Sequence, residues 1–193
     1  MSTAEIDERI LRAVQLQGEE RYQCLLALHR EALSRYTAAV RRVDQRDAAR
    51  ISSDGRAIAQ VVAHIADWDR YFILAAGEIA AGVQWPQFME LNGYVMEDGS
   101  RENFAGINEF NAFSALRTAD WSWDRIQRMA VQSAQTLFAM YSNPNLLSME
   151  KLETTRAYQT EEFGFPLSIP VGIYLWVIAI GHEMEEHALD LKM

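Results

Sequence analysis

The sequence predicts an all-α fold, a four-helix bundle whose helices run up, down, down and up. Apolar residues recur every three or four positions over four long segments, the spacing at which side chains share one face of a helix. Two long connections, residues 83–106 and 144–168, separate helices two and three and helices three and four. A long crossover lets the second and third helices run parallel. We expect residues 1–193 to form one domain, which suits a chain of this length.

The first predicted helix covers residues 2 to 43. Ser2 and Glu5 have the spacing of a capping box and precede the apolar stripe. The stripe passes Gly18 and resumes with the same spacing after it. We therefore expect one long helix with a kink near Gly18.

The second predicted helix follows a cap at Ser53 or Asp54 and stops near Gly82. The connection after it, residues 83–106, holds one proline and three glycines and has no sustained period. A stretch of this kind in a compact domain usually crosses the fold or covers a site, so we do not expect a second domain there. Its larger apolar side chains either line a pocket mouth or plug the end of the bundle. They are Trp85, Phe88, Met89 and Tyr94.

The third predicted helix covers residues 107 to 141 in two parts. We expect a break near Asp120 and a fresh cap at Ser122. The following connection, residues 144–168, is expected to contain at most a short helical turn.

The fourth predicted helix starts at Ser168 and Pro170, a cap and an early helical residue, and continues to about Lys192. It holds the longest apolar run of the chain, 13 residues from Ile169 to Gly181. A membrane-spanning helix needs about 20 such residues, so this segment is expected to be a core helix.

Composition limits the possible partners. The net charge of −9 and the pI near 4.9 argue against nucleic acid or an anionic membrane, because both are bound through basic patches. The single cysteine, Cys24, cannot form an internal disulfide, and the acidic N-terminus is not a signal peptide. These features predict a cytoplasmic protein.

The histidine spacing allows a metal site. Of four histidines, His29, His64 and His187 lie on apolar or half-apolar faces of predicted helices. Glu183 and His187 are four residues apart, so they project from one face and can bind one ion together. His182 lies about 140° from His187 around the helix, so these two cannot face the same point.

A structural interpretation stays open beside this one. Histidines on apolar faces are commonly core residues that satisfy a hydrogen bond, and Glu183–His187 could be an ordinary surface pair. Two sharper metal motifs are absent. A zincin needs His-Glu-x-x-His, and residues 182–187 contain one residue too many. A di-iron bundle needs Glu-x-x-His, and no histidine has an acidic residue three positions before it.

Three segments resemble the DinB/YfiT-like superfamily of four-helix bundles. They are VVAHIADW at residues 61–68, INEFNA at 107–112 and IAIGHEMEEHA at 178–188. The resemblance spans nearly the whole chain through the order and spacing of these segments. It implies a divalent metal held by one histidine on the second helix and a His-x-x-x-His pair on the fourth.

Carried onto this sequence, the resemblance places His64 and His187 among the metal ligands. Glu183 stands where the other histidine would be, and His182 is the alternative if the fourth helix is locally overwound. Two imidazoles and one carboxylate suit zinc, nickel or iron.

The resemblance further implies a metal-dependent enzyme that acts on small molecules, like a thiol transferase or a hydrolase. In such an enzyme the metal lowers the pKa of a low-molecular-weight thiol or of water. The resemblance also implies a homodimer. The alternative function is a non-catalytic bundle that acts as a dimeric or ligand-binding stress-response protein.

Overall fold

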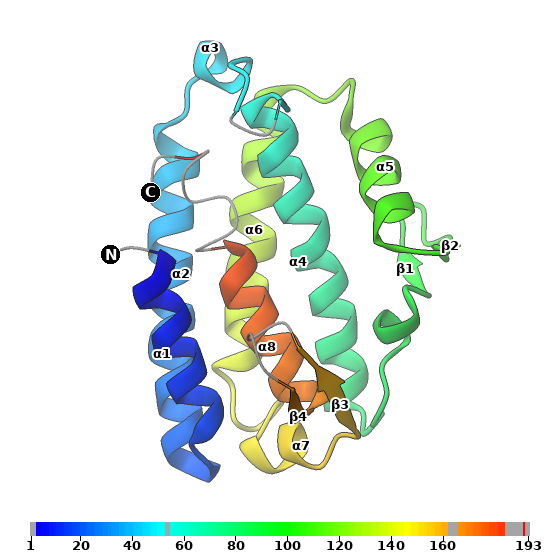
Figure 1. Cartoon of the computed structure of the whole chain (residues 1–193). Helices are drawn as coiled ribbons and strands as arrows, with labels where there is room; N and C mark the ends of the chain where they lie inside the picture. The colour runs from blue at the N-terminus through cyan, green and yellow to red at the C-terminus, as the bar shows by residue number, and fades with distance from the viewer. Residues whose placement is uncertain (1–2, 53–54, 162–165, 184–190, 192–193) are drawn as a thin grey trace.

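The computed structural model describes residues 3–52, 55–161, 166–183 and 191, and these are mostly helical (Figure 1). The α-helices are α1 (Thr3–Gln15), α2 (Gly18–Arg42), α3 (Gln45–Ala48), α4 (Ile58–Ala80), α5 (Ile107–Thr118), α6 (Trp123–Tyr141), α7 (Met149–Glu153) and α8 (Val171–Gly181). A 3₁₀ helix, η1 (Gln87–Glu90), and four short strands, β1 (Tyr94–Val95), β2 (Arg101–Glu102), β3 (Ala157–Thr160) and β4 (Leu167–Pro170), lie between them.

The segment predicted as one kinked helix is an antiparallel pair, α1 and α2. Gly18 has a positive φ of 53°, which glycine adopts without steric cost, and the chain reverses there. Arg9 of α1 forms an ion pair with Glu31 of α2, at 2.8 Å between Nη1 and Oε2. The prediction of a kink near Gly18 was therefore wrong, because an unbroken apolar spacing is also compatible with two helices that bury the same stripe.

The central helices are α4 and α6, which lie along one another (Figure 1). In that view α2 and α8 run upward, and α4 and α6 run downward. The backbone N–H of Ala57 donates to the Gln60 side chain at 2.9 Å, at the start of α4. The expected caps, Ser53 and Asp54, lie outside the described residues.

The third predicted helix is confirmed in both parts, α5 and α6. The Ser122 hydroxyl accepts a hydrogen bond from the backbone N–H of Arg125, as expected for a cap. The second helix ends as predicted, since Gly82 follows α4 with a φ of 92°.

The connection between α4 and α5 packs against the helices, as predicted. Its strands β1 and β2 form an antiparallel hairpin in which Tyr94 pairs with Glu102 and Val95 with Arg101. Tyr94 and Phe104 are buried in the same apolar cluster as residues of α1, α2, α4 and α8. Phe88 and Met89 pack on the edge of this cluster.

The connection between α6 and α8 contains α7, the short helical turn that the sequence allowed, and a second hairpin that the sequence did not predict. Strands β3 and β4 are antiparallel, with Ala157 opposite Pro170 and Thr160 opposite Leu167. Ser168 lies in β4 instead of capping a helix, and α8 begins after Pro170. Within the described residues, no helix combines the length and the apolar character needed to cross a membrane.

Gly172 marks a close contact between α7 and α8. A Cβ atom at this position would lie 2.9 Å from both Cα and O of Leu152. We expect Gly172→Ala to destabilise the protein by about 1–3 kcal/mol, because backbone atoms cannot move aside as a side chain can. The melting temperature should fall by about 2–4 °C for each kcal/mol.

Gly77→Ala in α4 is the matched control, since nothing lies within 4 Å of a Cβ added there. It should leave the melting temperature unchanged or raise it, because alanine favours a helix interior over glycine. Equal losses for the two variants would contradict the close contact at Gly172.

Candidate functional site: a histidine pair beside an aromatic cavity

The structure brings together His64 of α4 and His182, the residue that follows α8. Their Nε2 atoms are 3.3 Å apart, and both side chains are buried. Trp68, one turn after His64, presents its ring to both imidazoles, with centroid distances of 6.2 Å and 6.0 Å. Two ring nitrogens from segments distant in the sequence therefore lie next to each other.

This pair lies in the wall of a cavity of about 370 Å³. The other lining side chains are mostly aromatic or aliphatic, and the polar ones are an amide and two phenols. The lining residues are His64, Trp68, Phe72, Phe88, Met89, Leu91, Ile107, Asn111, Tyr158, Tyr174, Ile178 and His182.

The indole N–H of Trp68 donates to Oδ1 of Asn111 at 3.1 Å. This bond joins α4 to α5 across the cavity. The Trp68 ring also contacts Phe110 edge to face at a centroid distance of 4.7 Å. Phe88 and Met89, from the connection before α5, line the cavity, whereas Tyr94, on β1 of the hairpin, is fully buried and does not line it.

Of the expected ligands His64, Glu183 and His187, the structure describes the first two. Glu183 is fully buried and does not line the cavity; the charge of Asp69 on α4 acts on it, and its own charge acts on Tyr36 of α2. His187 lies outside the described residues. Among the residues that the structure describes, no group of three or more His, Cys, Asp or Glu side chains is arranged to hold a metal ion.

The backbone at the end of α8 explains which side chain meets His64. His182 and Glu183 follow α8 in a wider, π-type turn. Successive helical residues point about 100° apart, so only one of these two neighbours can face His64. In this structure that residue is His182, the alternative that the sequence left open.

His29 has a separate, structural environment. The indole N–H of Trp176 donates to its Nδ1 at 3.0 Å, and Phe138 and Tyr141 pack around the ring. Complete burial lowers the pKa of His29 to about 3, so the imidazole is neutral at physiological pH. It therefore does not belong to the histidine pair.

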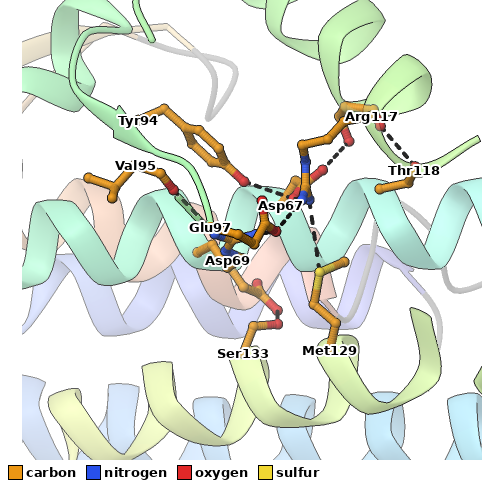
Figure 2. A network of polar contacts seen from close by, with 11 residues as sticks. Asp67, Asp69, Tyr94, Val95, Glu97, Arg117, Thr118, Met129 and Ser133 are labelled. Atoms are coloured by element: carbon orange, nitrogen blue, oxygen red, sulfur yellow. Dashed lines mark hydrogen bonds and ion pairs between the residues drawn. The ribbon is translucent and has the colours of Figure 1, made fainter. Parts of the chain in front are cut away.

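Among the residues that the structure describes, no cation pairs with the buried carboxyl groups of Asp69 and Glu183. The Ser133 hydroxyl donates to Oδ2 of Asp69 at 3.3 Å (Figure 2), while Oδ1 of Asp69 and both carboxyl oxygens of Glu183 have no hydrogen-bond partner within the described part of the chain. Burial raises the pKa of Asp69 well above its ordinary value. Burial, and then the charge of Asp69, raise the pKa of Glu183 in the same direction. Both groups therefore favour the protonated form.

A third buried carboxyl group, Asp67, is paired. It forms an ion pair with Arg117 of α5 and accepts hydrogen bonds from Tyr94 at 2.8 Å and Ser114 at 2.5 Å (Figure 2). Arg117 also contacts Glu97 of the first hairpin. Burial raises the pKa of Asp67, and the Arg117 charge opposes that rise. This network fixes α5 and the hairpin on α4.

Asp69 is not among the site residues expected from the sequence, although the sequence contains a signal for it. Val62, Ile65, Asp69 and Phe72 follow one another at gaps of three, four and three residues, which is the inward spacing of this helix. An acidic residue in such a stripe is costly to bury and therefore indicates a polar site in the interior.

Comparisons with known proteins give the fold but not the family. Two solved structures are similar to this one: mycothiol-dependent maleylpyruvate isomerase, with a TM-score of 0.58 and 17% identity, and a histidine-to-alanine mutant of that enzyme, with 0.59 and 16%. Each match covers 88% of this chain and 60% of the other, so this chain spans about three fifths of that enzyme. No protein-family model and no curated sequence matches. At this identity the likeness shows a shared fold alone.

We expect Asp69→Asn to raise the melting temperature at pH 8 in metal-free buffer. The pKa of Asp69 is higher in the folded than in the unfolded protein. The wild type therefore loses stability as pH rises from the ordinary aspartate pKa, about 3.9, through the folded value. An asparagine retains the Ser133 contact and does not ionise, so its advantage should vanish at acidic pH.

The control is Asp98→Asn, whose carboxylate is exposed and accepts hydrogen bonds from Ser100 that lower its pKa. The melting temperature of this variant at pH 8 should not exceed that of the wild type. A lower melting temperature for Asp69→Asn than for the wild type at pH 8 would show that Asp69 is stabilising as a charged group.

Proposed function

We propose that this protein is a small-molecule enzyme that uses a divalent metal and a low-molecular-weight thiol, with its site at His64 and His182. The observation that carries the proposal is the 3.3 Å separation of the two Nε2 atoms in the wall of an aromatic cavity. The fold shared with a mycothiol-dependent isomerase supports the thiol as co-substrate. We further propose that the helices form the up-down-down-up bundle expected from the sequence.

The histidine pair fits a metal of the zinc, nickel or iron class. Two nitrogens that each lie about 2.0–2.1 Å from a tetrahedral zinc are about 3.3–3.4 Å apart. The pair has this separation, and both donors are imidazoles, which suit all three metals. When bound, such a metal lowers the pKa of a thiol or of water and so supplies a nucleophile at neutral pH.

The third ligand belongs to the fourth helix in this proposal. A π-type turn joins residues five apart, and His187 is five residues after His182, so we propose His187 as that ligand. Glu183 is the competing candidate from the sequence. Its use would require a rotation that removes His182 from the cavity.

The cavity restricts the second substrate. Its described lining contains no arginine or lysine, so the proposed metal alone would have to balance the charge of a carboxylate-rich compound. The Asn111 Oδ1 already accepts the Trp68 bond, which leaves the amide nitrogen as a donor. We therefore propose an uncharged, largely apolar or aromatic substrate with one hydrogen-bond acceptor.

Three expectations from the sequence stay proposals: a single domain over residues 1–193, a homodimer and a cytoplasmic location. Sedimentation velocity at micromolar concentration tests the homodimer. A single species of monomer mass, near the chain mass of 22.0 kDa, would contradict it.

Metal analysis and thermal melting test the site directly. Protein purified without added metal should contain about one metal ion per chain. A chelator should lower its melting temperature by about ten degrees, since a ligand at a thousandfold excess over Kd stabilises by about 4 kcal/mol. His64→Ala and His182→Ala should each abolish this chelator effect.

His29→Ala is the matched control, because that histidine is equally buried but hydrogen-bonded within the core. This variant should lower the melting temperature both with and without chelator. The drop in melting temperature that the chelator causes should stay the same as in the wild type. A chelator effect that survives His182→Ala but is lost in Glu183→Gln would place the carboxylate, and not His182, on the metal.

One observation favours a second function. Apart from the histidines, the cavity is lined almost entirely by apolar and aromatic side chains, which suits the capture of an apolar ligand without catalysis. Protein with no bound metal and no chelator effect, but with saturable quenching of tryptophan fluorescence by an apolar compound such as naphthalene, would support this alternative.

A further inference from the structure

A second cavity, of about 430 Å³, lies between α4 and α6. It shares no lining residue with the aromatic cavity. On α4 it is lined by Arg70 and Ile73, and Ile73 points about 140° away from Trp68 around the helix. This cavity, which we call the arginine groove, is therefore separate from the histidine pair.

The arginine groove is positively charged in an acidic protein. Arg70, Arg125 and Arg128 line it, against a single lining carboxylate, Glu97. The whole chain has 27 acidic and 18 basic residues. Three guanidinium groups around one concave surface therefore stand out from the overall charge, and such a surface attracts anions.

Two of these guanidinium groups lack an anionic partner. Over the part of the chain that the structure describes, no carboxylate lies within ion-pair distance of Arg125 or Arg128. The Arg125 guanidinium stacks on Trp121, with Cζ 3.5 Å from the ring centroid. Stacking holds the planar group in place while its N–H donors stay available at the edge.

The third guanidinium is occupied by an exposed carboxylate. Arg70 donates to Oε1 of Glu97 at 2.7 Å, and Arg117 contacts the same oxygen. The Glu97 side chain is 46% exposed, whereas Arg117 is only 7% exposed and is anchored by Asp67. Glu97 is therefore the partner that can move, and an anion from outside would find the same donors.

We propose that the arginine groove binds a small molecule through an oxyanion group, a carboxylate or a phosphate. Arg125 and Arg128 bind the oxyanion in charge-assisted hydrogen bonds, for which the guanidinium fork is suited. Arg70 joins them when Glu97 swings away. Ile73 and Met129, which also line the groove, contact the apolar part of the ligand.

Isothermal titration at low ionic strength, with pyrophosphate and with succinate as separate probes, tests this proposal. We expect saturable binding of one anion per chain, weakened by added salt because charges dominate it. Arg125→Gln and Arg128→Gln should each weaken binding about tenfold, as loss of one charge-assisted hydrogen bond predicts. Tighter binding of pyrophosphate indicates a phosphorylated ligand, and tighter binding of succinate indicates a carboxylic acid.

Glu97→Gln should strengthen anion binding, the opposite of the arginine substitutions. The amide oxygen can still accept from Arg70, but the competing negative charge is gone, so we expect the anion to bind several-fold more tightly. Arg46→Gln is the charge-matched control, because Arg46 lies on α3 and does not line the groove. It should leave binding unchanged, and melting curves establish that each variant is folded.

Binding should persist in His64→Ala, which separates this site from the proposed metal site. Loss of binding in His64→Ala would place the anion at the histidine pair and overturn the proposal. Equal weakening by Arg46→Gln and Arg128→Gln would show that only the overall charge of the protein matters and would overturn the proposal. The absence of saturable binding would overturn it as well.

Discussion

The buried ion pair between Asp67 and Arg117 is the constraint on which the other features depend. Asp67 is fully buried and uses its oxygens to bind Arg117, Tyr94 and Ser114. These partners come from α5 and from the first hairpin, two elements that cover the same side of α4 (Figure 1). Loss of one member of such a pair leaves a buried charge uncompensated and costs about 3–5 kcal/mol. The pair therefore fixes how both elements dock.

Both cavities follow from this docking. Because Arg117 holds α5 against α4, Asn111 of α5 reaches the Trp68 indole and closes one side of the aromatic cavity. Because Arg117 also contacts Glu97, the hairpin lies at the edge of the arginine groove. One ionic network thus positions residues of two sites that share no side chain.

The sequence predicted the helices well and their connections poorly. Periodic apolar residues report burial of one face, which is why α4, α5 and α6 appeared at the expected places. The spacing of apolar residues does not indicate chain direction, so the reversal at Gly18 was predicted as a kink. The second hairpin was missed because its strands have four residues each, too few for a period-two pattern to stand out from the loop around them.

One member of the histidine pair, His64, was predicted from the sequence as a ligand, whereas the other, His182, was only the alternative. The sequence placed His64 on the inner face, and the structure agrees. It named Glu183 as the ligand and His182 as the alternative, because it assumed that the helix stays regular after Gly181. In a regular helix residues four apart share a face, whereas a π-type turn brings residues five apart closer to one face. A turn wider by one residue exchanges a carboxylate for an imidazole opposite His64. The exchanged carboxylate then needs a place in the interior, and Asp69 is its neighbour there. The winding at residues 182–183 therefore bears on both the histidine pair and the burial of Glu183 beside Asp69.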